Sequence, residues 1–251
     1  MAEDGAARRV LGVIPARLAS TRLQRKVLRE IAGEPMLAWV YRAARACPLL
    51  SQTLIATDSD AVMDFAQRHG MAAVFTPADC ASGTDRVYAV AQSIAADIYV
   101  NIQGDEPMLR PEHIAALLEP FERAEVAVAT LATPCAADQL ENPNAVKVVT
   151  AANGRALYFS RATIPYDRDA QGSVAYRKHL GLYAYRRAAL QQFPKLPPSA
   201  LEAAERLEQL RFLENGIDIY VTETPHDTIG VDTEEDLRRV EEILRRSRVS
   251  S

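Results

Sequence analysis

The sequence predicts an α/β fold built on a doubly wound, mostly parallel Rossmann-like sheet with a strand-rich insertion. Short apolar runs alternate with amphipathic segments over the first half of the chain, and short loops join them. Such units form parallel strands with right-handed crossovers. The chain has 251 residues, of which 48% are hydrophobic and 25% charged, an ordinary globular composition. We expect one domain over residues 1–251, with the insertion at about 126–190.

Charge and cysteine content exclude several classes of protein. The formal net charge of -4 argues against non-specific nucleic-acid binding, which needs a basic surface. The three cysteines, Cys47, Cys80 and Cys135, are odd in number and lack metal-ligand spacing, so neither a disulfide framework nor a zinc site is indicated. No segment is apolar enough to span a bilayer. We therefore expect a soluble cytoplasmic protein with no membrane partner.

The first predicted strand, Val10–Ile14, ends at Pro15 and is expected at the centre of the sheet. A loop over residues 16–33 follows, and Pro35 then opens an amphipathic helix to about Arg45. Loop amides and helix starts favour anions, so a triphosphate could lie here. A solvated basic loop is the alternative interpretation. The cations of the loop are Arg17, Arg22, Arg25, Lys26 and Arg29.

The next two strands are predicted at 53–57 and 72–76, with a helix over 61–69 between them. After the second of these strands, Ser82 to Arg86 opens an Ala- and Val-rich helix. A hydroxyl pair and Arg86 at the amino end of a helix suit an anion or a nucleobase. The same residues also make an ordinary helix cap, and that alternative stays open.

The fourth strand begins at Tyr99 and runs into a turn that holds Gly104, Asp105, Glu106 and Pro107. It reads as a buried strand that delivers two carboxylates to its carboxyl end, where open α/β sheets bind ligands. Mg²⁺ needs only one or two protein carboxylates when phosphates and water supply the other ligands. A solvated acidic turn is the simpler alternative. A helix over 112–123 follows.

After Val126 the pattern changes, because strand-like segments at 126–131, 146–150, 156–160 and 180–185 follow one another without helices. This predicts an antiparallel or mixed insertion, in which interleaved aromatic and basic side chains could hold a small polar acid. A helix over 201–214, a strand over 217–222 and a charged helix over 234–246 complete the chain. Asp232 precedes the last helix and is either its cap or a second metal carboxylate.

Taken in order, five stretches resemble the 3-deoxy-manno-octulosonate cytidylyltransferase family across nearly the whole chain. Each stretch is weak alone, but the ordered set is specific. The stretches are 14–23 (IPARLASTRL), 82–86 (SGTDR), 101–107 (NIQGDEP), 157–166 (LYFSRATIPY) and 230–233 (GVDT), and residues 177–183 and 207–211 match as well.

The resemblance implies a fold of the nucleotide-diphospho-sugar transferase type and a reaction in which CTP and the sugar acid give a CMP-sugar and pyrophosphate. It implies Mg²⁺ as cofactor and a homodimer. Arg17, Arg22 and Lys26 would hold the triphosphate, Ser82 and Arg86 the nucleotide, and Asp105 with Asp232 the metal. The residues expected around the sugar acid are Gln103, Arg161, His179, Tyr183, Glu208 and Gln209.

The chain departs from the usual Thr-Arg-Leu-Pro-Gly-Lys-Pro-Leu of this family at Gln24, Arg25 and Val27. Loss of two prolines and a glycine is expected to loosen the loop, and Arg25 to alter its phosphate contacts. Two alternatives stay open: a cytidylyltransferase for a related acidic sugar, such as an 8-amino analogue or a sialic-acid-like substrate, and a non-catalytic nucleotide-binding module of the same fold.

Overall fold

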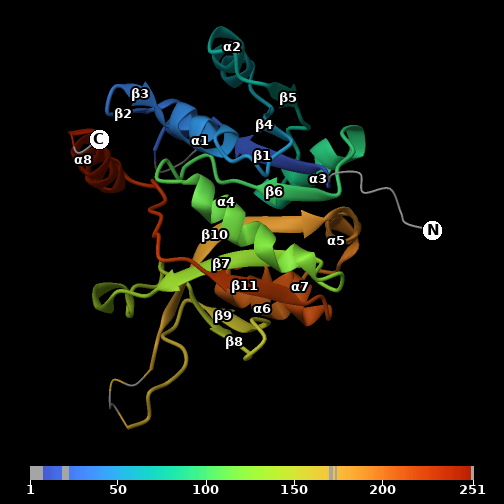
Figure 1. Cartoon of the computed structure of the whole chain (residues 1–251), viewed down its shortest axis with the longest axis vertical. Coiled ribbons are helices and arrows are strands. Elements are labelled where there is room, and N and C mark those ends of the chain that lie inside the picture. The colour runs from blue at the N-terminus through green and yellow to red at the C-terminus, as the bar shows by residue number, and fades with distance from the viewer. Residues whose placement is uncertain (1–7, 19–22, 170–171, 173, 250–251) are drawn as a thin grey trace. The chain divides into compact units, whose positions relative to one another are not determined.

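The structure is a computed structural model that describes residues 8–18, 23–169, 172 and 174–249. The chain forms two compact units, shown with their elements in Figure 1. Unit 1 comprises Met1–Pro111 and Ile229–Ser251, and unit 2 comprises Glu112–Thr228. The predicted insertion at about 126–190 lies inside unit 2.

Unit 1 contains a parallel sheet in the order β6-β1-β4-β5. The chain moves outward from β1 through β4 to β5 and then returns to place β6 on the other side of β1. The predicted central position of the first strand is therefore confirmed, and the strand order reverses between β1 and β6, which is where open α/β sheets bind ligands. The strands are β1 (Val10–Ala16), β4 (Gln52–Thr57), β5 (Ala73–Phe75) and β6 (Ile98–Asn101).

Helices connect these strands as the periodicity predicts. They are α1 (Met36–Arg45), α2 (Asp60–Arg68) and α3 (Gly83–Ser93); α8 (Glu234–Val249) belongs to the same unit but follows all of the strands. The basic loop holds more structure than its sequence indicates: a short 3-10 helix η1 (Lys26–Leu28) and a hairpin of β2 (Glu30–Ile31) and β3 (Glu34–Pro35). Ala32 and Gly33 turn this hairpin with positive φ of 51° and 81°, the backbone that tight hairpins need.

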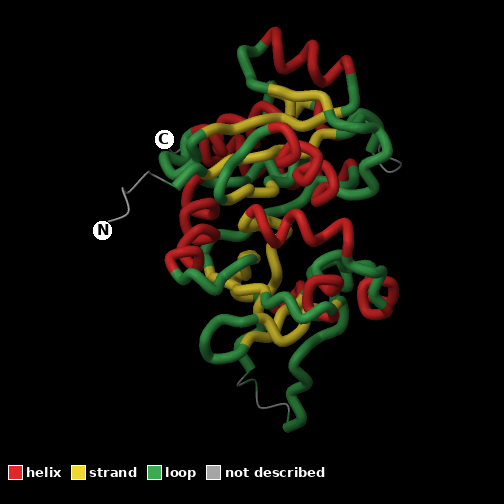
Figure 2. Tube along the Cα trace, turned by 90° about the vertical axis from the view of Figure 1, so that its right-hand side faces the viewer, coloured by secondary structure: helices red, strands yellow, loops and turns green. Residues whose placement is uncertain are grey.

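Unit 2 has a mixed sheet, as predicted. Its central strand β7 (Val128–Pro134) pairs in parallel with β11 (Ile219–Glu223) and antiparallel with β10 (Arg177–Arg186). The antiparallel pair β8 (Lys147–Thr150) and β9 (Ala156–Ser160) joins β10 through β8. Figure 2 shows the described residues between β9 and β10 as loop.

The helical elements of unit 2 are short: α4 (Pro111–Leu118), η2 (Glu119–Glu122), η3 (Ala137–Gln139), α5 (Arg187–Gln192), η4 (Phe193–Lys195), α6 (Ala200–Glu205) and α7 (Leu210–Glu214). None of the helices in the described part of the chain combines the length and apolar character that crossing a membrane requires.

The predicted single helix over 201–214 is wrong, because the segment forms two helices, α6 and α7. Arg206 adopts the left-handed conformation, with φ 54° and ψ 45°, and ends α6. This break turns Leu207 inward, where it is buried together with Leu210. Glu208 and Gln209 consequently lie in the turn between the helices rather than within one.

Candidate active site

The loop after β1 is tied to the start of α3 by Arg17. Its Nη2 donates to the backbone carbonyl of Cys80 and, at 3.4 Å, to that of Ser82. The half-buried Arg17 therefore lies near the carboxyl end of β1, at the edge where the strand order reverses. Arg22, the second cation predicted to hold a triphosphate, lies outside the described residues.

Lys26 brings together the two carboxylates predicted as metal ligands. Its ammonium donates to Asp105 and, at 2.8 Å, to Asp232 Oδ1. The Lys26 side chain is 14% exposed, against 28% for Asp105 and 42% for Asp232. Burial alone would lower the pKa of Lys26, but the attraction of the two carboxylates outweighs it and raises the pKa above its ordinary value. Lys26 is therefore a charged ammonium at neutral pH.

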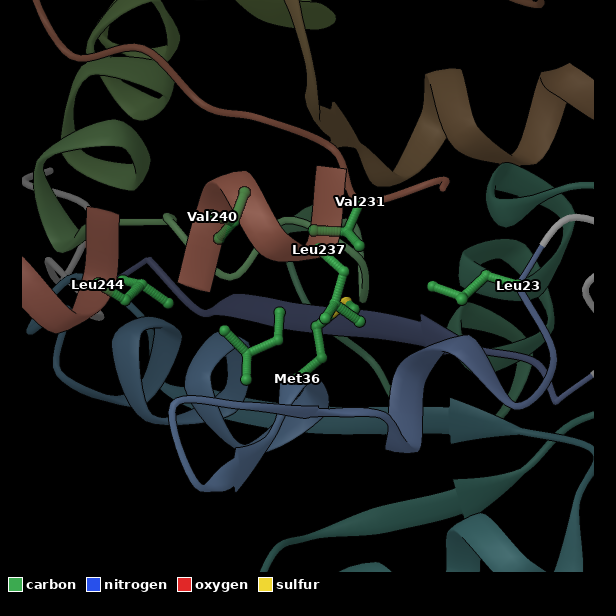
Figure 3. Packing of buried hydrophobic residues seen from close by; sticks show 7 residues of the cluster. Leu23, Met36, Val231, Leu237, Val240 and Leu244 are labelled. Atoms are coloured by element: carbon green, nitrogen blue, oxygen red, sulfur yellow. The ribbon is translucent and has the colours of Figure 1, made fainter. Parts of the chain in front are cut away.

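Asp232 reaches this position because its neighbour Val231 is fixed. The Val231 amide donates to the carbonyl of Asp105 at 2.9 Å. The Val231 side chain is fully buried in a cluster that also contains Leu23, Leu237 and Val240, as Figure 3 shows. Apolar packing of the last helix against the basic loop thus carries the Asp232 carboxylate to Lys26.

The last helix does not use Asp232 as its cap. Thr233 Oγ1 accepts from the amide of Asp236 at 3.1 Å, and the Asp236 carboxylate accepts from the Thr233 amide at 2.9 Å. This reciprocal pair is a capping box one residue beyond Asp232. Of the two roles left open for Asp232, capping is taken by its neighbour.

Gly104 allows the turn after β6 to approach β1 closely. A Cβ at this position would lie 2.8 Å from the carbonyl oxygen of Pro15, within β1. Only glycine avoids this clash without a shift of backbone. Asp105 follows directly, so its position depends on the close approach. Gln103, the predicted sugar contact on the same turn, is half-buried.

Ser82 and Arg86 are both engaged within unit 1. Ser82 caps α3 in a reciprocal box with Asp85, its Oγ accepting from the Asp85 amide at 3.1 Å. Arg86 is fully buried and donates to Thr76 and, at 3.1 Å, to Asp58. Within the described residues its Nε has no hydrogen-bond partner. The cap alternative is therefore realised for Ser82, and nucleotide binding by both residues stays a prediction.

Asn101 is a buried polar residue that sequence reasoning did not select. It ends β6, is 2% exposed, and its Oδ1 has no hydrogen-bond partner among the described residues. The side-chain nitrogen Nδ2 of Asn101 lies 3.5 Å from the position that a Cβ on Gly83 would take, at the amino end of α3. The sequence held a signal for this residue, because a polar side chain at the end of an otherwise apolar, buried strand needs a hydrogen-bond partner.

In unit 2, two of the predicted sugar contacts lie together around a β-bulge. The pairing of β10 with β7 shifts register between Leu180 and Tyr183. In a regular strand, residues four apart are separated by roughly 13 Å. The bulge and the length of the tyrosine side chain instead bring Tyr183 Oη within 2.9 Å of His179 Nε2, with ring centroids 5.4 Å apart.

Thr130 on β7 lies within hydrogen-bonding distance of His179. Its hydroxyl donates to the carbonyl of Leu182 at 2.7 Å and lies 3.0 Å from His179 Nε2. Burial lowers the pKa of His179 to about 3, so the ring is neutral at pH 7. Burial, with Tyr185 and Glu208 nearby, raises the pKa of Tyr183 well above its ordinary value.

Arg161 directs its guanidinium at backbone carbonyls. Nε donates to Glu205 O at 2.7 Å, Nη1 to Pro143 O at 2.8 Å and Nη2 to Arg206 O at 3.3 Å. The Glu205 carboxylate in turn accepts from the Arg161 amide at 2.9 Å. Glu205 was not selected from the sequence, where it was only one of several acidic helix residues. Contact between Arg161 and the sugar acid stays a prediction.

The turn that carries Glu208 and Gln209 borders a pocket of about 400 Å³ in unit 2. This volume is in the range of small-molecule sites. Gln209 is 7% exposed, and its Nε2 has no hydrogen-bond partner within the described part of the chain. The pocket is lined by Pro198, Ser199, Glu202, Ala203, Arg206, Glu208 and Arg211.

Comparison with known proteins decides the family. A family profile described as Cytidylyltransferase matches residues 11–219. The chain belongs to this cytidylyltransferase family. It is 74% identical over 235 residues to the 3-deoxy-manno-octulosonate cytidylyltransferase of Acidobacterium capsulatum, covering 94% of this chain and 96% of the relative. The corresponding protein of Koribacter versatilis is 62% identical over 237 residues, covering 94% and 90% of the two chains.

A solved structure agrees with this assignment. The chain resembles CMP:2-keto-3-deoxy-manno-octonic acid synthetase complexed with CTP, with a TM-score of 0.92 and 42% identity over 95% of this chain and 99% of that one. A putative glucose-1-phosphate thymidylyltransferase from Bacillus anthracis shares the fold at 18% identity and a TM-score of 0.66, covering 94% and 95% of the two chains. The predicted family and α/β fold are confirmed.

The carboxylates of this cytidylyltransferase fit Mg²⁺ in number and kind. Among the described residues, no three His, Cys, Asp or Glu side chains gather as a metal site would require if the protein supplied most ligands. Asp105 and Asp232 both contact one ammonium, so their oxygens converge closely enough to share a cation. Two carboxylates suffice for Mg²⁺ when phosphates and water complete the shell.

Proposed function

We propose that this cytidylyltransferase activates 3-deoxy-manno-octulosonate with CTP, releasing pyrophosphate. The observation that carries the proposal is the convergence of Asp105 and Asp232 on Lys26, after β6 and beside the basic loop, in a chain 74% identical to a relative of that name. The similar solved structure was complexed with CTP, which supports CTP as the nucleotide.

The reaction requires positioning and charge neutralisation rather than a protein nucleophile. The anomeric hydroxyl oxygen of the sugar forms a bond to the α-phosphorus of CTP. The bond from that phosphorus to the bridging oxygen breaks, pyrophosphate leaves with the electron pair, and the hydroxyl proton passes to water. Arg17, Arg22 and Lys26 bind the triphosphate and stabilise the charge that develops on the leaving group.

Asp105 and Asp232 would hold Mg²⁺, which when bound neutralises phosphate charge and acidifies a nearby hydroxyl. In unit 2, neutral His179 and protonated Tyr183 offer hydrogen-bonding groups suited to sugar hydroxyls, because both lie close to Thr130 in an ordered network. Glu208 borders the pocket, Gln209 follows it in the turn between α6 and α7, and both would contact the sugar acid there.

Asp105→Asn tests this proposal. Pyrophosphate release from CTP and Mg²⁺ is measured with 3-deoxy-manno-octulosonate, its 8-amino analogue and a sialic acid. We expect release with the first acid, and a loss of at least about 100-fold in the folded variant because removing an electrostatic contact to the reacting groups has effects of this size. Asp227→Asn is the matched control, since Asp227 pairs with Lys178 at 2.7 Å in unit 2.

Near-wild-type turnover of Asp105→Asn contradicts the assigned role of Asp105. Preference for another acid assigns this enzyme to that sugar, and no release with any acid favours a nucleotide-binding module. A homodimer is the expected oligomeric state, and light scattering of the purified protein measures it. The cytoplasmic location expected from the sequence also stays a prediction.

A further inference from the structure

The proposed metal ligands are joined by a cation of the protein itself. Lys26 donates to both carboxylates at once, and its side chain is the least exposed of the three, at 14%. Two neighbouring carboxylates repel each other, and the ammonium between them offsets that repulsion. The charged group that satisfies Asp105 and Asp232 is therefore already present without a metal.

A divalent cation bound between the same two carboxylate oxygens competes with this ammonium for its position. Both groups would carry positive charge within hydrogen-bond reach of the same carboxylates, and like charges at such distances repel. Mg²⁺ takes oxygen ligands at about 2.1 Å, closer than an N–H donor approaches, so a metal that bridges these two oxygens displaces the donor from the lone pairs it takes. Metal binding to the pair consequently requires that the Lys26 ammonium move.

The structure lets the side chain move while the backbone stays. Lys26 begins η1, in which the Leu28 amide donates to Arg25 O at 2.9 Å and the Arg29 amide to Lys26 O at 3.1 Å. Val27 anchors this turn by burial. The four-carbon lysine stem can rotate about its own bonds. A triphosphate in the basic loop carries more negative charge than the two carboxylates and would attract the ammonium.

We propose that Lys26 is the internal counter-ion of the Asp105–Asp232 pair, which keeps a divalent cation off these carboxylates until a triphosphate draws the ammonium away. The inference rests on the proposed function, which takes both aspartates as metal ligands. Nucleotide and metal then bind with positive coupling, and the coupling is reciprocal. The carboxylates are neutralised by the Lys26 ammonium before the triphosphate binds and by the metal afterwards, so the enzyme does not hold a metal where no phosphate is present.

The test is a titration of the full-length, nucleotide-free protein with Mn²⁺, with free Mn²⁺ followed by its electron paramagnetic resonance signal. We expect Lys26→Met to bind Mn²⁺ at least about tenfold more tightly than wild type, a change of about 1.4 kcal/mol. Lys26→Gln, which keeps a polar side chain without charge, should show the same gain and serves if the methionine variant does not fold.

Arg29→Met is the matched control. Arg29 belongs to the same loop and pairs with Glu234 at 2.7 Å, so its loss also removes one positive charge near Asp232. We expect its Mn²⁺ affinity to stay within about twofold of wild type. An equal gain in Arg29→Met would reduce the effect to general charge and overturn the role of Lys26.

Equal Mn²⁺ affinities in wild type and both Lys26 variants also overturn the proposal, as does the absence of Mn²⁺ binding in all of them. These outcomes are distinct from failure of the proposed function, which is measured as pyrophosphate release by the wild-type enzyme. If the wild type is active but the Lys26 variants bind Mn²⁺ with unchanged affinity, only the counter-ion role of Lys26 is wrong. If the wild type releases no pyrophosphate but the Lys26 variants bind Mn²⁺ more tightly as expected, the proposed activity is wrong and the counter-ion role of Lys26 stands.

Discussion

Gly104→Ala is expected to damage the site although it adds only one methyl group. The new Cβ would lie 2.8 Å from Pro15 O, and ordinary contact begins near 3.4 Å, so the turn or the strand must shift by about 0.6 Å. Pro15 lies within β1, which is hydrogen-bonded on both sides, so the turn that carries Asp105 should move instead. Overpacking of this kind costs about 1–3 kcal/mol.

The same substitution at Gly230 separates the clash from the general effect of alanine. Gly230 lies two residues before Asp232, and a Cβ there has no atom of the described residues within 4 Å. Replacing glycine by alanine in a compatible conformation stabilises a protein by about 0.4–1 kcal/mol, because the unfolded chain loses freedom. Gly230→Ala should therefore be neutral or slightly stabilising, and the difference between the two variants isolates the clash.

Thermal unfolding and pyrophosphate release measure the two consequences. A cost of about 2 kcal/mol corresponds to a fall in melting temperature of roughly 4–8 °C for a chain of this size. A displacement approaching 1 Å at Asp105 is expected to lower turnover by up to about 100-fold. If Gly104→Ala melts and turns over like Gly230→Ala, the close approach to Pro15 does not position Asp105, and the reasoning fails.

Two further predictions concern unit 2. The pKa of His179 is lowered by burial to about 3 in the folded protein and is about 6.5 in the unfolded chain, so the unfolded state binds the proton first. The free energy of unfolding is therefore highest well above pH 6.5 and decreases as the pH falls towards 3. At pH 5 the decrease caused by His179 is about 2 kcal/mol. Urea unfolding of His179→Gln, measured as a function of pH, should lack this decrease. Arg161→Lys should lower the free energy of unfolding by about 2 kcal/mol, because lysine cannot reach the three carbonyls that Arg161 contacts. The control is Arg155→Lys, because Arg155 forms only an ion pair with Asp218 at 3.4 Å, and it should change stability by less than about 0.5 kcal/mol. A raised sugar KM with unchanged melting in Arg161→Lys would instead identify a contact to the substrate.

The parallel half of the fold could be predicted because β1, β4 and β6 are largely buried and read as short apolar runs. The end of β1 was predicted too early, since the strand continues through Pro15 to Ala16. The strand β10 was predicted only from Leu180, since Arg177 and Lys178 do not resemble a strand. Their charges are satisfied by residues far along the chain, by Glu223 of β11 for Arg177 and by Asp227, at 2.7 Å, for Lys178. Ion-pair partners this distant in sequence are not visible in a local pattern.

Backbone conformation set the other limit on what the sequence could predict. The helical period continues through Arg206, so sequence predicts one helix where there are two, and the left-handed φ of 54° carries no signal in an arginine. Arg25 is similar, with φ 53° at a position where the family pattern has glycine. Arg25 therefore adopts the left-handed conformation that glycine takes readily, and it adds an exposed side chain to the loop.

Placement of Asp232 shows why charge patterns alone could not complete the site. Two carboxylates at a separation of about 5 Å would repel by roughly 3 kcal/mol at an effective dielectric constant of 20, and the Lys26 ammonium between Asp105 and Asp232 offsets part of that repulsion. Full burial of one Val or Leu side chain contributes about 1.5–3 kcal/mol, and Val231, Leu237 and Val240 together exceed the repulsion. The sequence shows the apolar period of the last helix but not the surface on which it packs. Because that surface includes Leu23 of the basic loop, packing of α8 and assembly of the carboxylate pair around Lys26 are one event.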